Sequence, residues 1–151
     1  MIYTSRYSNP ELRTGKYTVV GITRGAPKFA LHYPLSGNII EIAPPGWLFH
    51  ENDRARFTPK YFSNMDSIGV QRISDILTMY EKRGKPVVLC CYEDVRKPGE
   101  WCHRLVFAEW WLKRTGEIIE ELPDPSPCRL EKPKSEVQKP EEPASVQLKL
   151  W

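Results

Sequence analysis

The side chains best suited to chemistry are concentrated in one short part of this chain. Cys91 and Glu93 follow an apolar run, and Cys102, His103 and Arg104 begin a later one. A cysteine near a helix start has a lowered pKa and is a stronger nucleophile. Histidine exchanges protons near neutral pH, and arginine binds phosphate or carboxylate groups with two hydrogen bonds. These five residues therefore predict a catalytic site built around a reactive thiol.

Two secondary-structure elements are expected to position these side chains. Residues 85–92 form a nearly continuous apolar run, which is typical of a strand buried on both faces. Residues 102–116 have the composition of a helix, and Gly116 marks its end. Ligands bind beyond the carboxyl ends of parallel strands, and the free N–H groups of a helix start attract anions. Both elements therefore favour an anion site between Cys91 and Cys102.

The remaining elements indicate a small α/β domain. Ile73, Ile76, Leu77 and Tyr80 recur at i, i+3, i+4 and i+7, which predicts a helix at residues 67–84. Helix, buried strand, helix and strand then follow one another along the chain. This order favours a mostly parallel sheet with covering helices in three layers. The other expected strands are at residues 2–7, 16–24, 38–44 and 117–122.

The residues of the predicted site also resemble a known signature. The segments "CYE" at 91–93 and "CHR" at 102–104 are similar to the Cys-x-Glu…Cys-His-Arg pattern of a bacterial family, domain of unknown function 488. The resemblance covers residues 2–122. It implies an α/β fold with a pocket at the Cys-His-Arg element.

Two further strand ends agree with this resemblance. The segment "IYTSRYS" at 2–8 and the segment "ITRGAP" at 22–27 are similar to strand ends of the same family. By that similarity, Tyr7, Ser8 and Arg24 are expected to bind the substrate or its anionic group.

Other interpretations of the site are left open by the sequence. The segment "CYEDVR" resembles an anion-cradling loop of a sulfurtransferase or phosphatase, but it has no glycine that lets its amides converge. A zinc site would need Cys91, Cys102 and His103, whose spacing matches no standard pair of zinc ligands. The sequence therefore predicts no metal site and identifies no cofactor. A binding module without turnover is a further alternative, and Cys90 is expected only to pack in the core.

The composition changes where the predicted domain, residues 1–122, ends. Residues 123–146 contain many prolines, nearly balanced charges and few large apolar side chains. Such a segment cannot bury enough apolar surface to offset its conformational entropy. We therefore expect an extended, disordered linker.

The last five residues, 147–151, resemble a docking peptide. Gln147, Leu148, Leu150 and Trp151 match the Gln-Leu-x-Leu-aromatic motif by which bacterial DNA polymerases and repair factors bind the DNA sliding clamp, the polymerase III beta subunit. In such a peptide the glutamine makes orienting hydrogen bonds, while the leucines and the ring fill an apolar pocket. The sequence therefore predicts the clamp as a partner.

These observations lead to two functional hypotheses. The first is a clamp-recruited accessory protein of bacterial or phage DNA replication or repair, an enzyme whose α/β domain acts on or binds DNA or nucleotides. In it, Arg54, Arg56 and Lys60 contact the DNA backbone from a long irregular loop at residues 48–64. The alternative is a non-catalytic inhibitor or adaptor that occupies the clamp and blocks polymerase docking.

Composition limits the compartment and the class of partner. The net charge of +3 is compatible with nucleic-acid binding without requiring it. No apolar run approaches the roughly 18–20 residues of a membrane span, and the first residues lack the order of a signal peptide. The four cysteines are then expected to be thiols. We expect a cytoplasmic protein.

Overall fold

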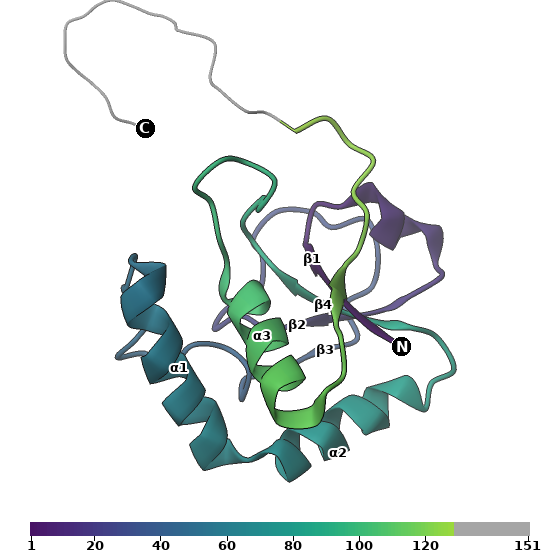
Figure 1. The fold of residues 1–151 in the computed structure, drawn as a ribbon. Helices are drawn as coiled ribbons and strands as arrows, with labels where there is room; N and C mark the ends of the chain where they lie inside the picture. Colours follow the sequence, from purple (N-terminus) through teal and green to yellow (C-terminus); the bar gives the residue numbers. More distant parts are fainter. Residues whose placement is uncertain (129–151) are drawn as a thin grey trace, which may run out of the picture.

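Five parallel strands form the centre of the molecule. A computed structural model of the chain describes residues 1–128 (Figure 1). The predicted clamp-binding motif and most of the predicted linker lie outside the described residues. The sheet has the order β3-β2-β4-β1-β5, and every neighbouring pair is parallel. The strands are β1 (Ile2–Arg6), β2 (Thr18–Gly21), β3 (Gly37–Asn38), β4 (Val87–Cys91) and β5 (Glu120–Glu121).

The central strand β4 explains why the sheet forms. All five of its residues are buried, and it pairs with β1 on one side and β2 on the other, so that Val87 lies opposite both Ile2 and Thr18. A strand covered on both faces needs apolar side chains in both directions, as the uninterrupted run in the sequence predicted. The predicted α/β class with a mostly parallel sheet is confirmed.

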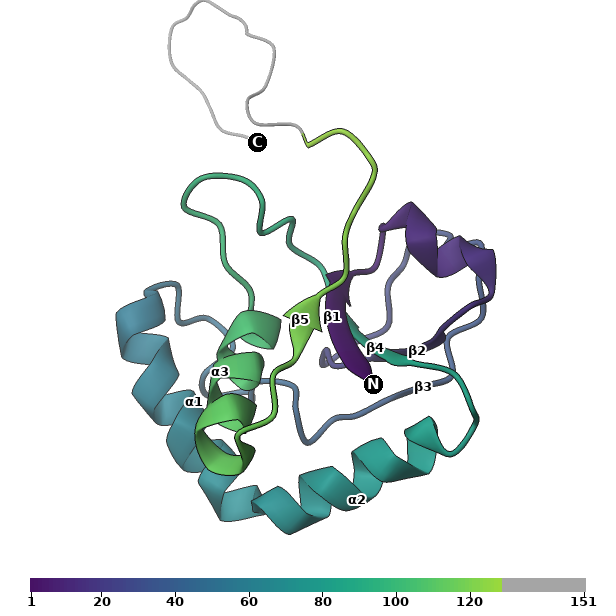
Figure 2. The same ribbon diagram turned by 45° about the vertical axis from the view of Figure 1, so that its right-hand side comes forward.

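The two faces of the sheet are covered differently. The helices α1 (Arg54–Ile68), α2 (Val70–Glu81) and α3 (His103–Thr115) all lie on one face, where they enclose the larger core (Figures 1 and 2). The opposite face is covered by the short 3-10 helix η1 (Pro10–Thr14), drawn in purple, and by the loop after β2. The third layer is therefore thin and contains no α-helix.

The expectation of an irregular loop at residues 48–64 is wrong, because α1 begins within it. Asp53 caps the helix by accepting a hydrogen bond from the backbone N–H of Ala55. Phe57, Tyr61 and Met65 follow at intervals of four residues, and all three are buried in the core. This apolar face holds the helix in place although Pro59 removes one of its backbone hydrogen bonds.

Three predicted strands are shorter than expected. The strand at 16–24 is reduced to β2, and the strand at 117–122 is reduced to β5. The strand predicted at 38–44 is wrong beyond its first residues. The N–H of Ile39 still donates to the carbonyl oxygen of Gly21 in β2, but the chain then turns and buries Ile42 in the core without pairing it to a strand. Apolar side chains can pack in the core from a turn as well as from a strand.

Contacts of the folded body continue beyond Leu122. Arg6 donates from Nε to the Asp124 carboxylate at 2.6 Å and also bonds Ser126. Arg96, from the loop before α3, donates to the carbonyl oxygens of Asp124 and Ser126 at 3.1 and 2.7 Å. The first residues of the predicted linker are therefore bound to the domain. Among the described residues, no helix has the length and apolar character of a membrane span.

The orientation of α2 can be tested by two matched substitutions. Leu77 is 1% exposed and Met79, two residues later on the same helix, is 61% exposed. Leu77→Ala should lower the free energy of unfolding by about 2–5 kcal/mol, because it leaves a cavity in the core. Met79→Ala should change it by less than about 0.5 kcal/mol. Urea unfolding followed by circular dichroism measures both, and similar costs would contradict the placement of the helix.

Candidate functional site

A large cleft opens at the carboxyl ends of β2 and β4. Its volume is about 820 Å³. The walls come from the segment after β2, the segment before α1, and the loop that joins β4 to α3, whose last residues lead into the helix. This is where a parallel sheet is expected to bind its ligands. The sequence-predicted residues Cys91, Glu93, Cys102, His103 and Arg24 all line it.

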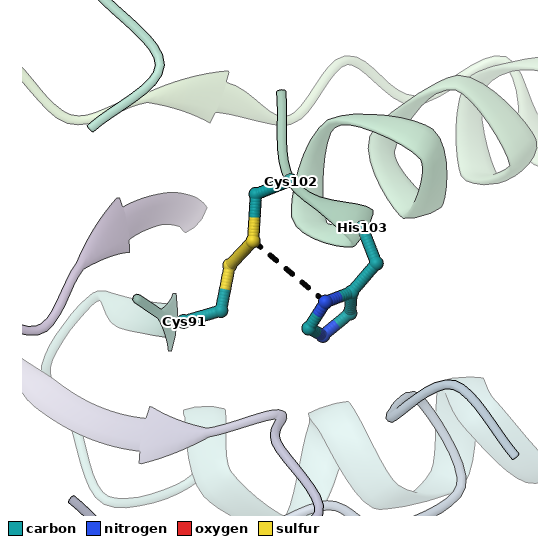
Figure 3. A group of neighbouring side chains, drawn as sticks. All are labelled: Cys91, Cys102 and His103. Carbon is teal, nitrogen blue, oxygen red and sulfur yellow. Dashed lines mark hydrogen bonds between the residues drawn. A yellow bond between two sulfur atoms is a disulfide. The ribbon is translucent and has the colours of Figure 1, made fainter. Parts of the chain in front are cut away.

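The two cysteines of the cleft are joined in the structure. Cys91 ends β4, Cys102 is the N-cap residue of α3, and their sulfur atoms form a disulfide (Figure 3). The expectation of four thiols therefore holds for Cys90 and Cys128 and is wrong for this pair. The physical reason is the packing of α3 on the sheet, which brings its first turn to the end of β4.

His103 is held with one ring nitrogen directed at this sulfur pair. Its Nε2 lies 2.5 Å from the carbonyl oxygen of Ile22, which can only accept, so Nε2 carries the proton. Nδ1 is then unprotonated and lies 3.7 Å from Cys102 Sγ. Burial, helped by the charge of Arg104, lowers the pKa of His103 to about 4. The imidazole is therefore neutral at pH 7, and the expected proton exchange near neutrality is not supported.

Arg104 does not reach the cleft, which corrects its predicted role in binding an anion. The side chain is 1% exposed and forms a bidentate ion pair with Glu121 of β5, with contacts of 3.0 and 2.8 Å. Its third nitrogen donates to Cys91 Sγ at 3.1 Å. Because it follows His103 on the helix, it points to the sheet edge and not to the opening. Arg104 therefore places a positive charge next to Cys91 Sγ, on the side of the sulfur that faces away from the opening of the cleft.

The three residues expected to bind a substrate anion lie in different places. Arg24 lines the cleft, and its guanidinium donates to the carbonyl oxygen of Pro44 at 3.4 Å. Tyr7 is buried beneath the cleft, where its hydroxyl bonds Thr23 at 2.7 Å and burial raises its pKa to about 12. Ser8 is exposed and lies outside the lining. Of the three, only Arg24 can contact a ligand in the cleft.

Aromatic residues also form part of the walls of the cleft. Phe29, Phe49 and Tyr92 line the cleft with exposed fractions of 47%, 55% and 43%, and Trp101 lines it near them. Together these rings give the cleft aromatic walls that a flat, apolar part of a ligand can contact. In the sequence, each of these aromatic residues lies in a turn-rich segment next to a predicted helix or strand. This position is the signal by which they could be found.

The basic residues expected to contact DNA lie on α1 and are paired. Arg54 pairs with Glu109 at 3.1 Å, Arg56 with Asp53 at 3.6 Å, and Lys60 with Glu51 at 3.7 Å. None of the three lines the cleft. The cation next to Arg24 in the lining is Lys28, from the loop after β2.

The comparisons with protein-family models, with curated proteins and with solved structures found no match to this chain. The resemblance to domain of unknown function 488 therefore stays a prediction that rests on the quoted segments.

The contribution of Arg104 can be measured by removing its charge. Arg104→Met should lower the free energy of unfolding by about 2 kcal/mol, less than for a fully buried pair because Glu121 is 34% exposed and can be hydrated. The control Arg54→Met breaks the exposed pair with Glu109 and should cost less than about 1 kcal/mol. Chemical unfolding of both variants measures the difference, and an equal cost would refute an anchoring role for Arg104.

Proposed function

We propose that this chain is a clamp-recruited accessory protein of bacterial or phage DNA replication or repair. Its α/β domain binds a nucleotide, or one base of single-stranded DNA, in the cleft and acts on it at the sulfur and imidazole groups of the floor. The observation that carries the proposal is the composition of the cleft, whose lining combines exposed aromatic rings, the cations Arg24 and Lys28 and three glutamates with Cys91, Cys102 and His103.

The size and the walls of the cleft support a single base as the ligand. A volume of about 820 Å³ lies in the range of small-molecule sites and is too small for a duplex. An enzyme that acts on a base in DNA must take it out of the stack, and flat side chains then receive it. Each stack of a base on an aromatic ring contributes about 1–3 kcal/mol. In this proposal Phe29, Phe49 and Tyr92 stack on the base, and Arg24 and Lys28 bind phosphate oxygens.

Recruitment to the clamp rests on the terminal motif. Gln147, Leu148, Leu150 and Trp151 supply the polar and apolar groups that a clamp-binding peptide needs. One short peptide binds weakly, and the ring form of the clamp raises the occupancy by offering several sites. The site of action in this proposal is the cytoplasm, where the replication machinery of bacteria works.

The non-catalytic alternative is favoured by one feature of the site. With Cys91 and Cys102 joined and Arg104 paired to Glu121, the floor of the cleft offers no free thiol in this state. An adaptor or inhibitor that occupies the clamp needs no such group. The two proposals differ in whether the cleft binds a nucleotide.

Clamp binding is tested with purified proteins. The chain of residues 1–151 should bind the immobilised clamp. Removal of residues 147–151, or the change Trp151→Ala, should abolish binding because the apolar anchor of the peptide is lost. The matched control is Lys149→Ala, at the variable position of the motif, which should bind as the full chain does. Equal binding by the truncated chain would end this part of the proposal.

Ligand binding in the cleft is tested with short single-stranded oligonucleotides and fluorescence anisotropy. Phe49→Ala should weaken binding about fivefold or more, since one stacking ring is removed. The control Ile118→Ala removes another exposed apolar side chain, on the segment after α3, and should have no effect. If the domain binds no oligonucleotide or free nucleotide, or if both variants bind as the unchanged chain does, the adaptor alternative is the better account.

A further inference from the structure

The floor of the cleft brings together three groups that bind metals. The sulfurs of Cys91 and Cys102 and a ring nitrogen of His103 all lie within 4.8 Å of one another (Figure 3). We propose that, when the two cysteines are reduced, these three residues hold one zinc ion whose fourth coordination position opens into the cleft. This inference does not depend on the clamp or on a nucleotide.

The separation of Cys102 and His103 is close to that of two zinc ligands, while the two sulfurs must move apart when their bond is reduced. Zn–S bonds of about 2.3 Å and Zn–N bonds of about 2.0 Å in a tetrahedron place a sulfur and a nitrogen ligand about 3.5 Å apart. The observed separation of Cys102 Sγ and His103 Nδ1 is 3.7 Å. The Cα atoms of Cys91 and Cys102 are 7.3 Å apart, beyond the roughly 6.8 Å usual for bridged cysteines. This backbone spacing leaves room for an ion between the two sulfurs.

His103 has the hydrogen bond that metal-binding histidines use. Such a histidine donates its other ring N–H to a carbonyl or carboxylate, which fixes the tautomer and the direction of the ring. Here Nε2 donates to the carbonyl oxygen of Ile22 at the end of β2. Nδ1 is therefore left with a free electron pair directed toward the sulfurs (Figure 3).

The charges around the site are balanced. Two thiolates neutralise a divalent cation, and the positive charge of Arg104 is already paired with Glu121. The Arg104 nitrogen 3.1 Å from Cys91 Sγ then donates a hydrogen bond to a metal-bound sulfur, which is a common outer contact of zinc thiolates. No uncompensated charge is left in this buried region.

The donor set and the opening favour zinc in a site of the catalytic type. Two cysteines and one histidine are ligands that zinc prefers, and catalytic zinc keeps one position for water or substrate. All three residues line the cleft, so that a ligand in the cleft can reach the ion. Among the described residues, no further cysteine or histidine completes the group, because Cys90 packs on the opposite face of the sheet.

The disulfide and the zinc site exclude each other. A reductant of the dithiol or phosphine class supplies two electrons, and with two protons from water the S–S bond becomes two thiols. Zinc then binds both sulfurs as thiolates and releases two protons. The structure shows the disulfide form of the pair, and the reducing cytoplasm proposed above favours the dithiol form.

The test uses the full-length chain reduced with a phosphine and titrated with Co²⁺ under nitrogen. Cobalt should bind in a ratio of one per chain, with the visible absorption of a tetrahedral thiolate complex, and Zn²⁺ should displace it. Cys102→Ser should remove the thiolate absorption or weaken binding at least tenfold, and His103→Gln should weaken it similarly. Cys128→Ser, which changes a free cysteine outside the group, should leave the titration unchanged.

The oxidised chain provides a control that needs no substitution. With the disulfide intact, the same protein should bind no cobalt. Because this comparison uses the unchanged sequence, its result does not depend on whether a variant folds. The proposal would be overturned if the reduced chain bound no cobalt. It would also be overturned if cobalt bound equally well after Cys102→Ser and after oxidation of the chain. The clamp and oligonucleotide experiments use the same chain, and their failure would leave a positive cobalt titration standing.

Discussion

The buried guanidinium of Arg104 is the contact on which the arrangement of the cleft depends. It joins the first turn of α3 to the edge strand through Glu121 and to the end of the central strand through Cys91. A charge that is almost fully buried must keep its partners, so it fixes both the position and the rotation of the helix start. Cys102 and His103 occupy the residues just before it and are thereby set against β4. The chemistry of the floor follows from this one ion pair.

The main elements of the fold could be predicted because their patterns are unambiguous. The apolar run of β4 and the helical spacing of Ile73 and Leu77 each admit one structure, and both were found. The helix α1 was missed because its apolar face consists of aromatic residues and a methionine among charged residues and a proline. The turn that buries Ile42 was predicted as a strand, since composition alone does not distinguish a paired segment from a packed one.

The site was predicted in part for a similar reason. The end of a parallel strand and the start of the next helix meet in space, so the approach of Cys91, Cys102 and His103 follows from topology. The direction of Arg104 and the burial of Tyr7 depend on the rotation of each element about its axis, which the sequence does not determine. The spacing of Cys91, Cys102 and His103 in the sequence disfavours a metal site, whereas the fold brings their ligand atoms within 4.8 Å of one another, which sequence spacing does not reveal.

The binding of residues 124–126 to Arg6 and Arg96 has a geometric consequence. Arg96 belongs to the loop that also carries wall residues of the cleft, so the last described residues run beside the rim of the opening. These residues therefore lie on the same side of the domain as the entrance of the cleft. Any segment that follows residue 128 is therefore joined to the domain next to the opening of the cleft, so that a partner bound to such a segment would be tethered near this opening.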